Sequence, residues 1–190
     1  MPNYYPYLIY HCNASCRFKI NGMKNVLFLL MLAVASSVLP QTSQIAAIGY
    51  VVRDIDRSEA FYTKVLGMQA AGDFSLDTAW SREAGAASGR PFSVRQFRLG
   101  DGPGATLLKL AYFEASEPRP SQEGLDTPAG VNYLTLAYPE LASVVARLRE
   151  AGVPILGHVK REGYQLIFVR DPDGLFIELV GPPEPSVIRD

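Results

Sequence analysis

The chain shows the same order of predicted elements twice, and this internal repeat limits the fold more than any other feature. In the first copy, residues 45–52 are apolar and rich in β-branched and aromatic residues, which is typical of a strand. A predicted helix then ends at Gly67, and two strands follow at residues 92–99 and 105–113, joined by a glycine-rich turn. The proline-containing segment 115–130 is typical of a linker, so the first copy ends before it.

The second copy repeats this order. Residues 131–138 form a predicted strand, Pro139 suits the first position of a helix, and Gly152 ends that helix. Three more strands are predicted at residues 155–159, 164–169 and 175–180. One helix on one face of each mostly antiparallel sheet predicts the α+β class.

The first copy is about sixteen residues longer than the second, and the extra residues fall within 70–91. This segment contains Trp80, the one tryptophan of the chain, in a stretch with helical character. A long inserted segment often forms a wall or lid over a binding site, which makes Trp80 a candidate ligand-binding residue. In the alternative, the segment is a surface excursion in which Trp80 fills a gap in the core.

The composition is that of a globular protein. With 190 residues, of which 48% are hydrophobic and 19% charged, the chain has enough apolar side chains for one substantial core. The formal net charge of −1 provides no basic surplus for phosphate groups, which argues against nucleic acid as a partner. The lysines and arginines are also scattered, which argues against stable contact between the folded domain and an anionic membrane.

Residues 23–40 have the pattern of a signal peptide, with a lysine before an apolar run at 26–35 and a small-residue site at Ala33-Val34-Ala35. The run is too short for a bilayer span, which needs about 20 apolar residues, and an uncleaved anchor is the lesser alternative. We therefore predict cleavage, no stable membrane contact afterwards, and a periplasmic or secreted protein. Residues 1–22 are interpreted as a leader or a misassigned start, and they contain both cysteines of the chain.

Two motifs carry a family resemblance. Phe61-Tyr62 precede Val65-Leu66-Gly67-Met68 in the first copy, and the second copy closes with Arg170-Asp171-Pro172-Asp173-Gly174-Leu175-Phe176-Ile177-Glu178-Leu179. With the repeated element order, these motifs resemble the vicinal oxygen chelate superfamily of glyoxalases, bleomycin resistance proteins and extradiol dioxygenases. The resemblance implies one domain at residues 44–182, made of half one (44–114), a linker (115–130) and half two (131–182), and a tail follows at residues 183–190.

In that family, two βαβββ modules form a cup-shaped, mostly antiparallel eight-stranded sheet with flanking helices. A divalent metal on the floor of the cup is held by His and Glu side chains from both modules. Substrates chelate this metal through two neighbouring oxygens. Family members pair as homodimers, and some build the cup across two chains, so the resemblance implies a homodimer as one assembly of this chain.

Three of the four metal-binding positions of the family carry other residues here. The first-strand His of half one falls on Ala47, and the Glu of half one falls on Lys109. The His of half two falls on Tyr133, or on Asn132 if the register shifts by one, and only Glu178 keeps its identity. Because a divalent ion needs several imidazole or carboxylate ligands, we predict a site without a metal cofactor.

Lys109 would repel a divalent ion, whereas it would complement Glu178. Opposite charges at about 4 Å gain on the order of 4 kcal/mol at an effective dielectric of about 20, before desolvation is subtracted. We therefore predict that both side chains face the cavity and form a salt bridge where the metal would lie. In the alternative, Lys109 extends to solvent while Glu178 stays at the edge of the core.

Strand alternation extends the predicted site. If Glu178 faces the cup, Phe176 and Val180 face it too, and the residues between them face the helix. The same alternation places further residues on the walls of the cup, namely Ala47, Gly49, Val51, Tyr133, Thr135 and Ala137. These mainly apolar walls suit a small hydrophobic or aromatic molecule, which a few polar groups such as Thr135 would orient.

Three functions are compatible with these residues. The first is binding of a small, largely apolar molecule without a metal, as in bleomycin-resistance-like members. The second is a metal-independent lyase or isomerase, with Glu178 as base and Tyr133 or His158 as its catalytic partner. The third, which has the fewest suitable residues, is a metal-dependent enzyme of the glyoxalase I or dioxygenase kind. Simpler interpretations exist for His158, as a solvated loop residue, and for Asp171 and Asp173, which lie in a typical turn sequence.

Overall fold

The computed structural model describes residues 45–100, 102, 105–126 and 129–183. The chain divides into residues 1–43 and residues 44–190, and all described residues belong to the second unit. The predicted leader, the predicted signal peptide and nearly all of the predicted tail therefore lie outside the described residues. No helix within the described ranges is long and apolar enough to cross a membrane.

Each half contains four strands and the helical segments between them. Half one consists of β1 (Ala47–Val51), α2 (Ile55–Ala60), the π-helical turn η1 (Phe61–Val65), β2 (Gln69–Leu76), α3 (Thr78–Glu83), the 3-10 turn η2 (Ala87–Gly89), β3 (Phe92–Arg98) and β4 (Leu107–Tyr112). Half two consists of β5 (Tyr133–Ala137), α4 (Ala142–Glu150), β6 (Gly157–Arg161), β7 (Tyr164–Arg170) and β8 (Phe176–Gly181). The predicted α+β class is confirmed.

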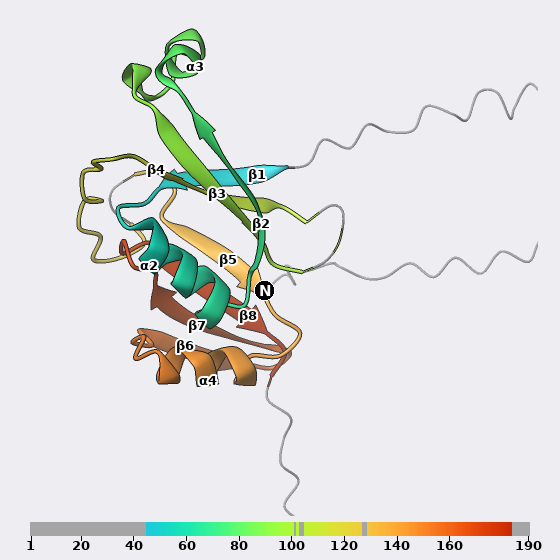
Figure 1. Ribbon diagram of the computed structural model, residues 1–190. Coiled ribbons are helices and arrows are strands. Elements are labelled where there is room, and N and C mark those ends of the chain that lie inside the picture. Colours follow the sequence, from blue (N-terminus) through green and yellow to red (C-terminus); the bar gives the residue numbers. More distant parts are fainter. Residues whose placement is uncertain (1–44, 101, 103–104, 127–128, 184–190) are drawn as a thin grey trace, which may run out of the picture. The chain divides into compact units, whose positions relative to one another are not determined.

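The strands of the described residues form two four-stranded sheets, in the orders β1-β4-β3-β2 and β5-β8-β7-β6. In each sheet the first and last strands of the half pair in parallel, while the other pairs are antiparallel. The two halves therefore share one βαβββ-like topology, as the repeat predicts, in two mixed sheets. Figure 1 shows β2 and β3 extending beyond the other strands of their sheet and carrying α3 at their far end.

Local signals fix the ends of α2. The side chain of Asp54 accepts a hydrogen bond from the backbone N–H of Arg57 (3.0 Å), which caps the start of the helix. The helix continues through η1 and ends at Gly67, whose φ of 79° is the left-handed conformation that glycine favours. The C-terminal stop predicted from the sequence is therefore correct.

The start of α4 differs from its prediction. The helix begins at Ala142, after Pro139 rather than at it. The backbone N–H of Tyr138 still donates to the carbonyl of Val180 (2.8 Å), so the chain stays extended beside β8 beyond the end of β5. Leu141 then turns into the core, where it is 2% exposed, and the helix follows.

Strand β2 has no clear signal in the sequence. It mixes small, polar and charged residues, so apolar alternation does not identify it. Pairing with β3 holds it in place, with a bulge between Ala70 and Gly72. Tertiary pairing therefore creates a strand in a segment that local propensity leaves undecided.

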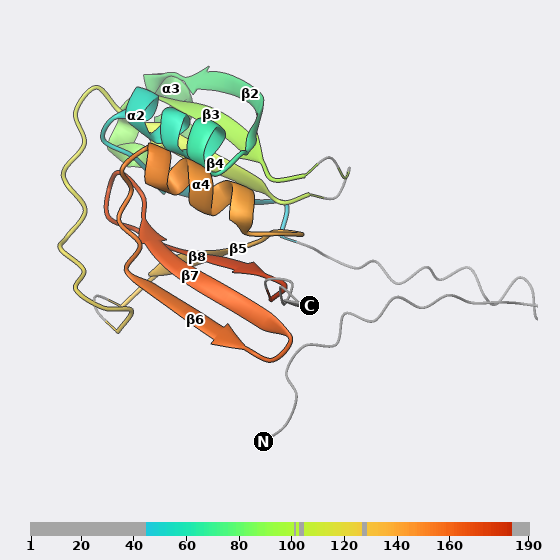
Figure 2. The ribbon, with the colours of Figure 1, turned by 90° about the horizontal axis from the view of Figure 1, so that it is seen from below.

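One hydrophobic core joins the two halves. Leu110 of β4, Leu148 of α4 and Ile177 of β8 are all fully buried within it. Nε of Arg147 in α4 donates to the carbonyl of Val65 in η1 (2.7 Å), and Figure 2 shows α2 and α4 next to each other. Because both helices belong to this core, the uncovered side of each sheet points away from it. We call these sides open face one, on β1 to β4, and open face two, on β5 to β8.

Candidate functional site

Open face two carries most of the residues predicted to bind the ligand. On β8, Ile177 is fully buried toward the helix, so the neighbouring Glu178 lies on open face two. The strand register places Thr135 beside Glu178 and Tyr133 beside Phe176. The hydroxyl of Thr135 donates to Oε2 of Glu178 (2.6 Å). The alternation predicted for this half is confirmed.

Aromatic rings lie next to this carboxylate. The ring centroids of Tyr133 and Phe168 are 6.4 Å apart, and those of Phe168 and Phe176 are 6.3 Å apart, both in edge-to-face arrangements. Phe168 is also the β7 register partner of Glu178. Phe168 is not among the predicted ligand-binding residues, although alternation along residues 164–169 identifies it. Open face two thus combines a carboxylate, a hydroxyl and an aromatic cluster.

Open face one carries the predicted wall residues of half one. The register of β1 and β4 puts Gly49 beside Lys109, and the predicted wall residues Ala47 and Val51 flank Gly49 on the same face. Val51 is 51% exposed. Nζ of Lys109 lies 5.9 Å from the ring centroid of Phe74, within the range of a cation–π contact. The single ammonium group of this face therefore packs on an aromatic ring of its own sheet.

The predicted salt bridge between Lys109 and Glu178 is wrong for a single chain. Within the described part of the chain, the ion pairs are those of Arg95 with Asp56 and Glu59. The two open faces point away from a shared core, so Lys109 and Glu178 lie on separate surfaces. How two sheets are oriented depends on helix packing, which strand alternation does not specify.

The prediction that His158 is a catalytic partner of Glu178 also needs correction. Register pairs His158 with the fully buried Ile167, so its side chain lies on the helix-facing side of β6, opposite to open face two. Its Nε2 is 2.9 Å from Oε1 of the buried Gln165. His158 therefore belongs to the sheet edge and not to the surface around Glu178.

Trp80 lies in half one, in α3 at the far end of β2 and β3. Its ring is 6.1 Å from that of Phe92, which in turn stacks on Phe113 at 5.1 Å. Trp80 remains 45% exposed, so it does not fill a core gap completely. Within one chain, Trp80 and Tyr133 belong to separate aromatic groups. Trp80 could therefore act as the predicted lid residue only over a site that a second molecule helps to form.

A cavity of about 340 Å³ runs along the free edge of β5. Its lining includes Tyr133 and Thr135, both predicted ligand-binding residues. The other side is apolar and includes Ile48, Phe97 and Leu108 of half one. The volume lies within the range of ligand pockets, about 300–1,000 Å³, and the lining includes the hydroxyl-bearing side chains Tyr133 and Thr135.

A buried carboxylate connects the halves at the turn after β7. Oδ1 of Asp171 accepts the backbone N–H groups of Asp173 (2.9 Å) and Leu175 (2.8 Å), which is the turn predicted from the sequence. Oδ2 accepts the hydroxyl groups of Tyr62 (2.9 Å) and Tyr50 (3.0 Å) from half one. The two tyrosine hydroxyls also contact each other. Asp171 is therefore a structural bridge with four donors.

Burial changes the ionisation of this cluster. Desolvation raises the pKa of Asp171, although the hydrogen bonds it accepts oppose that shift. Burial raises the pKa of Tyr50 and of Tyr62, and the neighbouring Asp171 carboxylate adds to both shifts. Tyr138, whose hydroxyl donates to the carbonyl of Leu66 (2.8 Å), has its pKa raised to about 12, again mainly by burial.

Alkaline pH is expected to destabilise the protein. The pKa values of Tyr50, Tyr62 and Tyr138 in the folded chain lie above the unfolded value of about 10. Their contribution to stability is therefore complete below about pH 10. It is lost as the pH rises further, because the unfolded chain releases these protons first. Urea unfolding from about pH 8 to about pH 11 should show the decline. Tyr138→Phe should make it shallower, and an unchanged slope in this variant would contradict the assignment.

Comparison with known proteins identifies the class to which this two-module fold belongs. The sequence model of the Glyoxalase/Bleomycin resistance protein/Dioxygenase superfamily matches residues 44–179. The chain belongs to this superfamily, which is the vicinal oxygen chelate superfamily that its motifs resemble.

Individual relatives are distant. The lactoylglutathione lyase of Pseudomonas aeruginosa is 27% identical over 138 residues, which cover 68% of this chain and 77% of that protein. A glyoxalase/dioxygenase from Nostoc punctiforme is 28% identical, with a TM-score of 0.54 over 78% of this chain and 98% of the other. A glyoxalase family protein from Bacillus cereus shares the fold at 17% identity, with a TM-score of 0.62 over 78% of this chain and 99% of the other. The chain is thus distantly related to glyoxalase I.

The residues present do not fit the divalent metal that this superfamily implies. The register Gly49 to Lys109 in half one matches Thr135 to Glu178 in half two, so Lys109 occupies the position equivalent to Glu178. By the same register Ala47 is equivalent to Tyr133. No cluster of three or more His, Cys, Asp or Glu side chains that could hold a metal occurs among the described residues. A cation in place of a second carboxylate opposes a divalent ion.

Proposed function

We propose that this protein binds a small, largely apolar molecule at open face two, without a divalent metal. The observation that carries the proposal is the Thr135–Glu178 hydrogen bond next to the apolar cavity along β5. Such a site offers apolar walls for most of the ligand and a few polar groups that orient it. The aromatic cluster around Phe168 would supply further contact area.

We further propose that a homodimer completes the site. Val51 on open face one and Tyr133 on open face two are 51% and 46% exposed, so both faces leave apolar surface uncovered in one chain. If open face one of one protomer covers open face two of the other, Lys109 meets Glu178 of the partner subunit. The charge pair predicted from the sequence would then form between protomers and close a cup around the ligand.

Charge reversal tests this arrangement. Lys109→Glu and Glu178→Lys, each alone, are expected to weaken binding of the apolar dye Nile red by at least about tenfold, because each change replaces an attraction across the cup with a repulsion. The double variant restores the attraction with exchanged signs, and should recover both the dye affinity and the dimer in sedimentation velocity. Lys160→Glu is a matched control outside both open faces.

Failure of the double variant to recover would contradict the proposed pairing. A requirement for added Ni²⁺ or Zn²⁺ in dye binding would contradict the metal-free site. Equal losses in the Lys160→Glu control would show that any added negative charge weakens dye binding, and would also count against the proposal.

A second candidate function is a metal-independent lyase or isomerase with Glu178 as its base. The hydroxyl groups of Thr135 and Tyr133 on the same face as this carboxylate favour it, since they could hold a substrate oxygen. Turnover of lactoylglutathione, the compound in the name of the Pseudomonas relative, is the direct assay. If Glu178→Gln retains dye binding but loses turnover, the second candidate replaces pure binding.

We also propose that residues 23–40 direct export, so that the mature protein is periplasmic or secreted. The support is the sequence pattern of a basic start, a short apolar run and a small-residue cleavage site. The N-terminal sequence of the protein recovered from its native host would locate the cleavage.

A further inference from the structure

A second cleft lies between the helix of half one and the loop that follows α4. Its volume is about 500 Å³. Phe61 and Val65 of η1 form one apolar wall, and Val153 and Pro154 form the other. None of these residues belongs to either open face. The cleft is therefore separate from the site proposed above.

Three cations line this cleft, namely Arg170 and two residues from the same helical segment. Arg57 comes from α2 and Lys64 from η1, and both side chains are exposed. Neither forms an ion pair among the residues that the structure describes, since the pairs present involve Arg95. A cleft with apolar walls and two cations that form no ion pair with described residues favours a ligand with an apolar body and a negative head.

The other charged groups in the cleft are already bound. Asp171 is its only lining carboxylate, and both oxygens accept hydrogen bonds from within the protein. Arg170 donates to the carbonyl of Gly174 (2.9 Å), and its guanidinium carbon lies 4.0 Å from the ring centroid of Phe176. These two side chains hold the fold together, which leaves Arg57 and Lys64 to meet a ligand.

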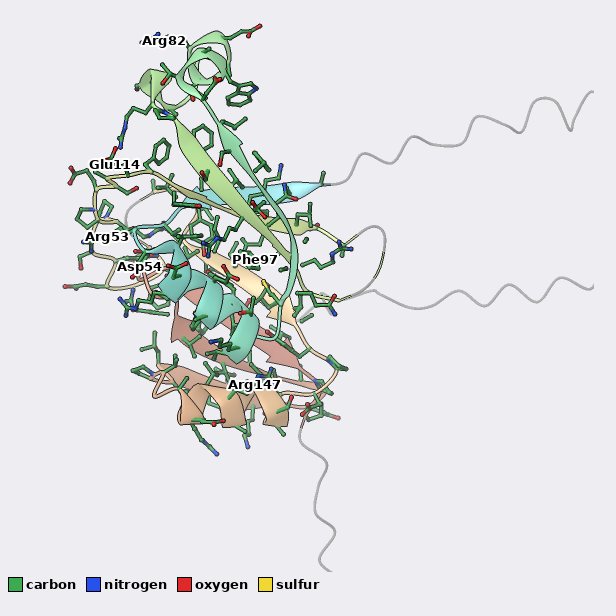
Figure 3. All side chains as sticks on the ribbon, viewed as in Figure 1. Arg53, Asp54, Arg82, Phe97, Glu114 and Arg147 are labelled. Atoms are coloured by element: carbon green, nitrogen blue, oxygen red, sulfur yellow. The ribbon has the colours of Figure 1, made fainter. Side chains whose placement is uncertain are left out.

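Apart from Asp171, the acidic residues near this cleft lie beyond Arg57. Asp54, Glu114 and Asp173 line a neighbouring hollow of about 390 Å³, together with Arg53 and Arg57. Figure 3 shows Arg53, Asp54 and Glu114 on one side of the molecule, away from Arg147 in α4. This hollow has mixed charge, so an anion gains more in the cleft, where Lys64 adds to Arg57.

We propose that this cleft is a second binding site, for a small amphipathic carboxylate. The alkyl or aryl part of the ligand lies against Phe61, Val65 and Val153. Its carboxylate lies between Arg57, whose planar guanidinium suits a carboxylate, and Lys64. The cleft volume of about 500 Å³ lies in the lower half of the range for ligand pockets. It is sufficient for a chain of about ten carbons.

Calorimetric titration with decanoate tests the site in the full-length protein. We expect saturable binding of one decanoate per chain, and affinity at least about tenfold lower in the double variant Arg57→Glu/Lys64→Glu. Decanol, which has the same chain without the charge, should bind more weakly than decanoate. The control double variant Arg82→Glu/Lys160→Glu makes the same change of residue types outside the cleft, and should bind decanoate as the wild type does.

Several outcomes would overturn this second site. Equal losses in the two double variants, or no loss in either, would show that Arg57 and Lys64 do not hold the carboxylate. Displacement of Nile red by decanoate would place the ligand at the open faces instead. Because Arg57 and Lys64 lie outside those faces, unchanged Nile red binding in Arg57→Glu/Lys64→Glu separates this test from that of the proposed cup.

Discussion

Replacing Asp171 by alanine is expected to lower the free energy of unfolding by about 3–5 kcal/mol. The change removes the acceptor of four donors at once, two tyrosine hydroxyls from half one and two backbone N–H groups of its own turn. Asp171 is 5% exposed, so little water can replace the lost oxygens. Urea unfolding at neutral pH, followed by circular dichroism, measures the difference.

Asp173 provides the matched control in the same turn. Its carboxylate accepts the backbone N–H of Arg53 at 3.2 Å, in an exposed position. Asp173→Ala should therefore cost less than about 1 kcal/mol. Asp171→Asn keeps one carbonyl acceptor and should fall between the two alanine variants. Equal losses in Asp171→Ala and Asp173→Ala would mean that Asp171 acts only as a turn residue, and would contradict the bridge.

The turn and the bridge at Asp171 differ in how far the sequence predicts them. The Asp-Pro-Asp-Gly sequence predicts that Oδ1 of Asp171 binds the backbone of its own turn, because that interaction is local. Tyr50 and Tyr62 lie more than a hundred positions away along the chain, and they reach Oδ2 because the two halves pack against each other. No local pattern specifies that packing, so the predicted turn role of Asp171 is correct but incomplete.

The same distinction explains the rest of the fold and the site. Glycine stops, apolar runs and the repeated order predict the α+β class and most strands, whereas β2 is fixed by its pairing with β3. Alternation predicts that Glu178 and Thr135 share a face, because side chains in a strand have a period of two. Whether Lys109 can reach Glu178 depends on how the two sheets are oriented, which the sequence does not specify. The side of the sheet on which His158 lies depends on the register between β6 and β7.

Replacing Ile177 by aspartate should lower the free energy of unfolding by more than about 4 kcal/mol, because it places an unpaired carboxylate in an apolar core. Ile177 is fully buried. The next residue, Glu178, lies on open face two, where its carboxylate accepts a hydrogen bond from Thr135. A shift of the strand by one residue would exchange these two positions. The variant therefore tests which side of β8 faces the core, and urea unfolding at low protein concentration is the measurement.

Val51→Asp is the matched control, since it exchanges another β-branched residue for the same charge. Val51 lies on open face one and is 51% exposed, so its carboxylate stays in water and the expected loss is within about 1 kcal/mol. In the proposed dimer this position becomes covered, so Val51→Asp should weaken association in sedimentation velocity while leaving the unfolding of the single chain nearly unchanged. If Ile177→Asp were as stable as Val51→Asp, the shared core and both open faces would have to be reassigned.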